Sequence, residues 1–204
     1  WKGLIRLSDK KVEHISAFLS DRKEWTPQKL LTNKNIAFQG ATVLGLGFTM
    51  SEEKALALIE EDSKNKNILF PYLIGRNLNS DPHQKASRWI INFWDWPEEK
   101  AKKYEACYRI VKEKVKPQRD SLPNNSQGLR RKRFWWLYGE KGSTLFHVIS
   151  FAHHFINHPD DWSDEKIPSR SVIVCSLVSK YLAFTFVPTK QIFSHRLAVF
   201  ANTN

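Results

Sequence analysis

The sequence predicts an α+β fold, with a mixed, largely antiparallel sheet packed against two or three helices, one of them long and basic. Short apolar runs typical of strands fill the last third of the chain, and helical patterns lie before them. These segments do not alternate as regular βαβ units would. Hydrophobic residues make up 41% of the 204 residues, which is enough for a buried core.

The first 35 residues are predicted to be a helical arm or linker that enters from a preceding domain. Residues 10–20 carry a rough apolar stripe, and Pro27 and the polar residues 33–35 then mark a connection. The main domain is predicted to span residues 36–204. Because the chain starts at Trp1 without a signal-peptide pattern, we expect a fragment of a longer protein.

The first half of the main domain mixes strands and helices. Residues 36–49 are predicted to form a strand, a turn and a strand, and Ser51 is expected to cap a helix that runs to about Glu61. A strand restarts at residues 68–70. Pro71 is expected to confine the next residues to a sheet edge or a loop, because proline cannot donate a ladder hydrogen bond.

A long basic helix is predicted in the middle of the chain. It follows an apolar strand at residues 89–93, has Pro97 in its first turn and ends at Pro117. A loop is expected over residues 122–128. One apolar stripe supports the helix at spacings of three and four, formed by Ala101, Tyr104, Tyr108, Val111 and Val115.

The last third is predicted to be rich in strands. The candidate strands are residues 134–138, 146–151, 171–175, 181–187 and 197–200.

Positive charge is concentrated in one part of the chain. The net charge is +11, and residues 100–140 hold twelve Lys and Arg against four acids, which is a net +8. A solvated helix face is the simplest reading of one charge run, but an excess this large predicts a surface that follows phosphates. Nucleic acid or an anionic membrane surface would match such a charge. No apolar run is long enough to span a membrane.

The two cysteines, Cys107 and Cys175, are predicted to be buried free thiols, although a disulfide is possible from the sequence. Free thiols fit a reducing cytoplasm, which is the predicted location.

Three short patterns suggest chemistry that their surroundings do not favour. Gly45-Leu46-Gly47 lacks the third glycine of a dinucleotide loop, so a tight turn is predicted. His154 and His158 have the spacing of two metal ligands, but no Glu lies between them and no Cys is near. Asp160 and Asp164-Glu165-Lys166 faintly resemble a nuclease metal site but fit a surface loop better. No catalytic constellation is visible, so this chain is expected to bind no cofactor or metal.

Several blocks, in order, resemble a known family. They are Phe38-Gln39-Gly40, Gly45-Leu46-Gly47-Phe48, residues 70–79 (FPYLIGRNLN), residues 87–93 (SRWIINF), Trp96-Pro97, residues 115–119 (VKPQR), Trp135-Trp136, and the late stretch from Val178 to Leu197. Together they are similar to the C-terminal part of large adenine-specific DNA methyltransferases of restriction–modification systems, including the type IIG and IIL enzymes. The resemblance covers roughly residues 36–200.

This resemblance implies that residues 36–204 are a DNA target-recognition domain. In that family the catalytic domain precedes this region. It carries a glycine-rich motif that binds S-adenosylmethionine and an Asn/Asp-Pro-Pro-aromatic motif that meets the adenine, and neither motif occurs in this sequence. The implied partners are double-stranded DNA and the catalytic methyltransferase domain of the same parent chain. The parent is expected to methylate adenine, which must leave the base stack first, and to cleave DNA if it is of the combined type. The alternatives are a protein-interaction or scaffold domain with a basic face and a nuclease at Asp160/Asp164.

The candidate DNA-binding residues come from both arguments. The basic run supplies most of them, the family-like blocks add Arg76 and Arg119, and one of Trp135 and Trp136 is expected to face DNA. An arginine in such a block can equally be a salt-bridge or loop anchor, and this is the favoured reading of Arg88. The candidates are Arg76, Lys112, Lys116, Arg119, Arg130, Arg131, Lys132, Arg133 and Trp136.

Overall fold

The protein divides into two compact units, Trp1–Lys34 and Asn35–Asn204. The computed structural model describes residues 3–22, 36–149, 151–159 and 170–201. In the first unit, strand β1 (Arg6–Leu7) pairs antiparallel with β2 (Lys10–Lys11).

The prediction of a helix over residues 10–20 is wrong, because these residues form β2 and turns, and the side chain of Phe18 is 86% exposed. So short an amphipathic helix is not stable unless its apolar face packs against something. The predicted connection at Pro27 and residues 33–35 lies outside the described part of the chain.

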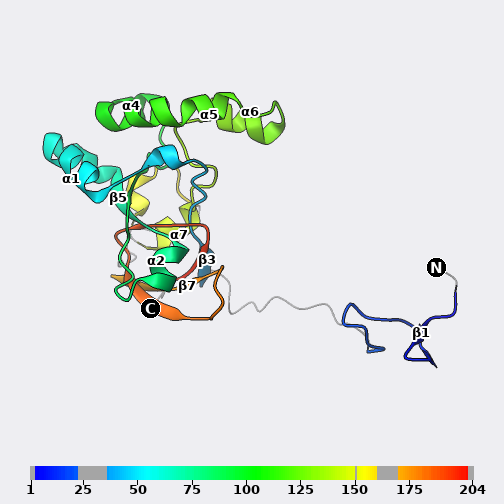
Figure 1. Cartoon of the computed structure of the whole chain (residues 1–204). Coiled ribbons are helices and arrows are strands. Elements are labelled where there is room, and N and C mark those ends of the chain that lie inside the picture. The colour runs from blue at the N-terminus through cyan, green and yellow to red at the C-terminus, as the bar shows by residue number, and fades with distance from the viewer. Residues whose placement is uncertain (1–2, 23–35, 150, 160–169, 202–204) are drawn as a thin grey trace. The chain divides into compact units, whose positions relative to one another are not determined.

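Two four-stranded sheets form the framework of the second unit (Figure 1). One has the order β3-β10-β7-β8 and is antiparallel throughout. The other has the order β4-β6-β5-β9, and its β5 and β9 strands run parallel. The strands are β3 (Ala37–Gln39), β4 (Thr49–Met50), β5 (Leu69–Leu73), β6 (Trp89–Ile91), β7 (Ser171–Ser176), β8 (Phe184–Pro188), β9 (Ile192–Phe193) and β10 (Leu197–Phe200). The predicted α+β class with a mixed, largely antiparallel sheet is confirmed.

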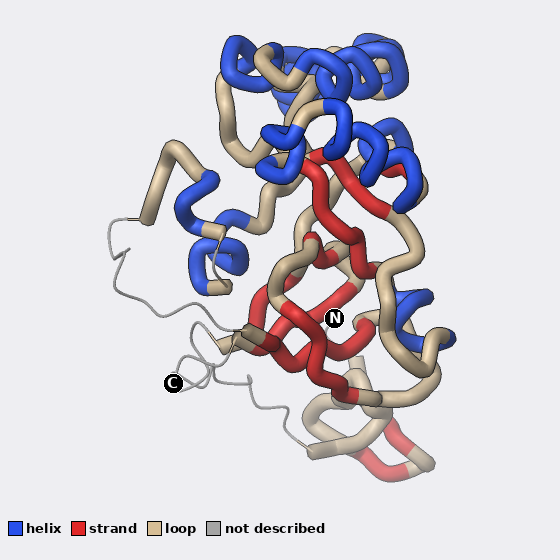
Figure 2. The backbone as a smooth tube through the Cα atoms, turned by 90° about the vertical axis from the view of Figure 1, so that its left-hand side faces the viewer, coloured by secondary structure: helices blue, strands red, loops and turns tan. Residues whose placement is uncertain are grey.

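The described residues contain seven α-helices, which is more than the two or three expected. Figure 1 shows α4, α5 and α6 following one another in a row, and Figure 2 shows several helices gathered at one end of the strands and others beside the strands. The helices are α1 (Glu52–Glu61), α2 (Gly75–Ser80), α3 (Glu98–Lys102), α4 (Glu105–Lys114), α5 (Lys116–Asp120), α6 (Ser126–Arg133) and α7 (Ser143–Val148), with the 3-10 turns η2 (Leu46–Phe48), η3 (Ser63–Asn67) and η4 (Ala152–His154).

Two local signals near the start of the domain had different outcomes. Ser51 caps α1, since its side chain accepts a hydrogen bond from the backbone of Lys54 at 3.3 Å, as predicted. Pro71 does not lie at a sheet edge, because β5 runs between β6 and β9. Tyr72 donates toward β6, to the carbonyl of Arg88, so the nitrogen of Pro71 faces the other side. Strand β9 pairs only from Tyr72 onward, so no hydrogen bond to Pro71 is missed.

The prediction of one long basic helix is wrong in one respect, because the segment forms a series of shorter helices. The first break comes at Lys103 and Tyr104, between α3 and α4, and the second at Val115, between α4 and α5. Pro117 does not end the helix, because it lies in the first turn of α5, where no backbone donor is needed. Helix α6 then starts at Ser126, inside the predicted loop.

The aromatic segments after α6 are not strands, contrary to prediction. Residues 134–138 form a turn, and residues 143–148 form α7, which begins after Gly142 in the left-handed conformation at φ +65°. Trp135, Trp136 and Phe146 are buried in the core. Preference for strands largely reflects the packing of bulky side chains, and here turns and a helix bury the same side chains.

One continuous core joins the sheets to the helices. It includes Val111 and Val115 of the predicted apolar stripe, with Tyr104 and Tyr108 packed against its margin. Both Cys107 and Cys175 are buried free thiols, as predicted. In the described part of the chain, no helix has the length and apolar character needed to cross a bilayer.

Candidate nucleic-acid interface

Helices α4, α5 and α6 form a layer that we call the basic layer. On its inner side, Val111 and Val115 are buried, and α4 lies directly against η2. Gly47 makes this approach possible, because a Cβ there would lie 2.7 Å from the Cβ of Lys114 and 2.7 Å from Cγ2 of Val115. Lys112 and Lys114 are exposed, and only the base of the Lys114 side chain borders Gly47. The apolar stripe therefore turns the lysines of α4 toward solvent.

Four consecutive cations end the basic layer at the C-terminus of α6. Asn125 caps the start of this helix, because its side chain accepts a hydrogen bond from the backbone of Gly128 at 2.8 Å. The last turn carries Arg130, Arg131, Lys132 and Arg133. Cations at a helix C-terminus are favoured by the helix dipole.

Few carboxylates neutralise these cations. Lys132 donates to the side-chain oxygen of Asn124 at 2.6 Å, and Arg131 donates to that of Gln127 at 3.3 Å. The only carboxylate ion pair that the described residues offer to α6 joins Arg130 to Glu140 at 3.6 Å, and both side chains are largely exposed. An exposed ion pair contributes little energy, so the cluster remains available for an anion.

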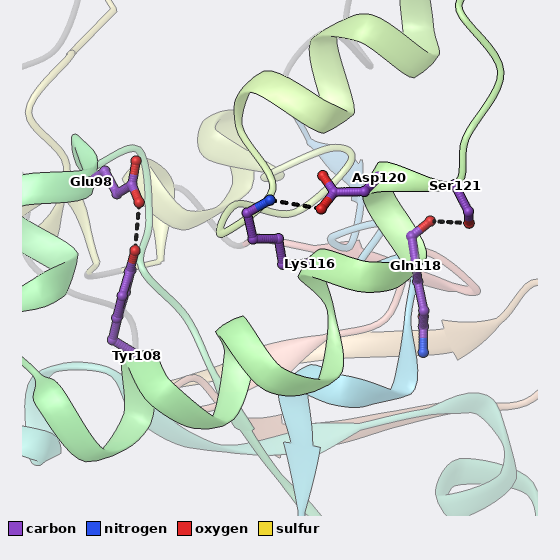
Figure 3. A network of polar contacts seen from close by, with 6 residues as sticks. All are labelled: Glu98, Tyr108, Lys116, Gln118, Asp120 and Ser121. Carbon is purple, nitrogen blue, oxygen red and sulfur yellow. Dashed lines mark hydrogen bonds and ion pairs between the residues drawn. The ribbon is translucent and has the colours of Figure 1, made fainter.

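Other ion pairs of the basic segment are also on the surface. Figure 3 shows Lys116 paired with Asp120 at 2.7 Å, one turn along α5. Figure 3 also shows Tyr108 donating to the carboxylate of Glu98, at 2.5 Å. Lys102 lies 3.7 Å from the same carboxylate. Burial raises the pKa of Tyr108 above its ordinary value, and the Glu98 carboxylate raises it further. The two ion pairs join neighbouring turns of α3 and of α5, the Tyr108–Glu98 hydrogen bond joins α4 to α3, and none of these contacts involves a cation of α6.

Two predicted contact residues are inside the protein. Arg119 is 4% exposed and donates a hydrogen bond to the carbonyl of Val43 at 3.3 Å. Trp136 is 6% exposed and donates to the carbonyl of Trp96 at 2.9 Å, and Trp135 is buried beside it. Both predictions are corrected: Arg119 is an anchor, and neither tryptophan faces solvent. The aliphatic stem of Arg119 and the rings of the two tryptophans are buried in the apolar core.

The remaining candidates lie at two places. Lys112, Lys116 and the four cations of α6 all belong to the basic layer. Arg76 is exposed on α2, a helix that contacts β7 instead. Figure 1 shows α2 well away from the row of α4, α5 and α6. The structure therefore brings together the charge-run residues and leaves out Arg76, which came from the family-like blocks.

A cavity of about 480 Å³ adjoins α6 and was not foreseen from the sequence. Its lining includes Arg130, Arg131 and Phe134 from α6 and its end, and Trp96 and Glu140 from other segments. These residues are up to 44 positions apart in the chain. No local sequence pattern connects them, so only the tertiary fold reveals the cavity.

One wall of the cavity is held by a strained segment. Trp94 has φ +53°, a left-handed conformation that costs a bulky residue about 1–2 kcal/mol. Its backbone donates to Asn92, and its indole donates to the carbonyl of Asn67. Burial opposes ionisation of the next residue, Asp95, but hydrogen bonds from the Ile156 and Asn157 region outweigh this and lower its pKa.

Two of the alternative sites lie in the part of the chain that the structure describes, and neither assembles. Gly45 has φ +130° in the predicted tight turn. His154 stacks on Trp94 with ring centroids 4.5 Å apart, whereas His158 lies against His147, with their ring nitrogens 3.0 Å apart. The described residues contain no group of three His, Cys, Asp or Glu able to hold a metal ion. The Asp160/Asp164 segment lies outside the described part.

Comparison with known proteins gives a likeness of fold. No protein-family model and no curated protein sequence matches the chain. Among solved structures, it is similar to the Type IIL restriction-modification enzyme MmeI, determined in complex with DNA, with a TM-score of 0.56 and 12% sequence identity. The match covers 96% of this chain and 23% of that chain, so this chain spans less than a quarter of the enzyme's length. At this identity, the likeness concerns the fold alone.

Proposed function

We propose that this chain is the DNA-recognition module of a restriction–modification enzyme. The observation that carries the proposal is the cluster of four cations at the end of α6, of which a single one has a described carboxylate partner. Arg and Lys neutralise phosphates and set the register of a protein on duplex DNA. The fold shared with a restriction–modification enzyme supports the same function.

In this proposal the chain positions duplex DNA for a catalytic domain that lies elsewhere in the parent enzyme. That domain would transfer a methyl group from S-adenosylmethionine to an adenine. The role of this chain is to hold the flanking duplex while the adenine leaves the stack. The chain itself contributes phosphate contacts through the basic layer, and base contacts through side chains that reach the major groove.

The salt dependence of binding tests the proposal. Each neutralised phosphate steepens the fall of the binding constant with salt by about 0.9 in a log–log plot. Replacing Arg130 and Arg133 with Ala should therefore lower the slope by about 1.8. The matched control replaces the exposed Lys54 and Lys190 with Ala. Both lysines lie outside the basic layer, and their replacement removes the same amount of positive charge.

Fluorescence anisotropy of a labelled duplex, measured over a range of salt concentrations from low to physiological, gives both slopes. The arginine variant should lose affinity for all sequences alike, and the lysine control should keep the slope of the parent chain. Equal slopes for the two variants, or no binding of the parent chain at low salt, would refute the assignment.

A second candidate function is a protein-interaction domain. One observation favours it: the antiparallel sheet carries exposed apolar side chains, Phe184 and Phe186, on its edge strand β8. Exposed apolar patches commonly mark protein contacts. Retention on immobilised duplex DNA but not on polyglutamate supports DNA recognition, whereas equal retention on both supports an acidic protein partner.

A further inference from the structure

The cavity beside α6 combines an apolar floor with cations at its edge. The floor is formed by Trp136, Leu137 and Tyr138, which are all buried. The indole of Trp136 donates to the Trp96 carbonyl, and the Tyr138 hydroxyl donates to the Ile91 carbonyl at 2.6 Å. Because the polar atoms of these rings are paired with the protein, the floor offers a ligand chiefly apolar surface.

Phe134 gives the cavity a partly exposed aromatic ring, and the guanidinium of Arg133 lies over this ring, 5.3 Å from its centroid. Phe134 is 39% exposed at the end of α6, and its ring packs edge-on to Trp136 with centroids 5.8 Å apart. An exposed ring held in place by a buried one is suited to stacking on a flat ligand. A volume of about 480 Å³ lies within the range of small-molecule sites and would admit one nucleotide.

The edge of the cavity is positive but partly occupied by an acid. Arg130, Arg131 and Lys141 line it together with Glu140, whose carboxylate lies 3.6 Å from Arg130. An arginine fork binds phosphate in two places at once, so a phosphate group would compete with Glu140 for Arg130. A ligand with a flat apolar part and an anionic part satisfies both the floor and the edge.

We infer that this cavity binds an unpaired nucleotide of the DNA, with its base against Phe134 and its phosphate on Arg130 and Arg131. The inference rests on the proposed function, because α6 must already hold the DNA backbone. It adds a site for a base outside the helix. Stacking on one aromatic side chain contributes about 1–3 kcal/mol per base, which favours a base that is already unpaired.

A duplex with one bulged nucleotide tests the inference against a perfect duplex of the same sequence. The full chain should bind the bulged duplex about tenfold more tightly, the equivalent of about 1.4 kcal/mol. A 2-aminopurine at the bulge should change fluorescence when it stacks on Phe134. Phe134→Ala should abolish the preference and keep the affinity for perfect duplex within about twofold.

Two further variants locate the effect. Leu129→Ala is the matched control, since Leu129 is an exposed apolar residue of α6 outside the cavity lining, and it should keep the preference. Glu140→Gln should strengthen binding of the bulged duplex several-fold more than binding of the perfect duplex, because it frees Arg130 for the phosphate of the unpaired nucleotide. This gain does not depend on whether the Phe134 variant folds.

The outcomes separate the two proposals. Binding of perfect duplex without any preference for the bulge overturns the cavity inference and leaves DNA recognition intact. A preference that survives in both the Phe134 and the Glu140 variants unchanged also overturns it. Failure to bind either duplex at low salt overturns the proposed function and, with it, the nucleotide site.

Discussion

Replacing Arg119 with methionine should stabilise the protein. The guanidinium is buried, makes one hydrogen bond to the Val43 carbonyl at 3.3 Å, and leaves its Nε without a partner among the described residues. Burial lowers the pKa of Arg119, and the nearby Arg131 lowers it further, so the folded state disfavours this charge. Methionine has a similar length and adapts to irregular core space.

The expected magnitude is the difference between opposing contributions. Removing a charge from water costs several kcal/mol in a protein, and the hydrogen bond to Val43 returns about 1.5–3 kcal/mol. Arg119→Met removes both and leaves one carbonyl unpaired, so we expect a net gain of about 1 kcal/mol in the free energy of unfolding. In a protein of this size, such a gain raises Tm by about 2–4 °C.

Urea denaturation and a thermal scan would measure this change. Arg119→Ala is the comparison, because it also removes the charge but leaves a cavity, and it should be less stable than the methionine variant by about 2–5 kcal/mol. The salt slope of DNA binding should not change in either variant, since a buried arginine releases no counterion. A methionine variant less stable than the parent chain would show that the charge is compensated, and the reasoning would fail.

Three further predictions concern the core. Burial and the neighbouring charges of His153 and Lys100 lower the pKa of His154 to about 3, so acid protonates this histidine in the unfolded chain before the folded one. The free energy of unfolding should therefore fall by about 2 kcal/mol from pH 7 to pH 5. His154→Phe should remove that loss in denaturation curves. Tyr138→Phe leaves the buried carbonyl of Ile91 without its donor and should cost about 1–3 kcal/mol by urea denaturation. Gly47→Ala should cost a similar amount, about 1–3 kcal/mol, because its new methyl group would lie too close to α4; an unchanged Tm would contradict the close approach.

The sequence determined those features that depend on neighbours in the chain. Ser51 caps a helix because its side chain reaches a backbone donor three residues away. Val111 of α4 and Val115 at its C-terminal end face the core because helical spacing places them on one side. The charge excess of residues 100–140 predicted the basic layer for the same reason, since consecutive helix turns keep those residues together.

Only the tertiary structure decided where the bulky aromatic residues lie and which cations remain outside. Trp136 and Phe146 satisfy the core equally well from a turn and a helix, so their preference for strands did not fix the backbone. Arg119 and Arg130 look alike in the sequence, yet one is buried against Val43 and the other edges a cavity. Burial depends on contacts between distant segments, and no pattern of neighbouring residues encodes them.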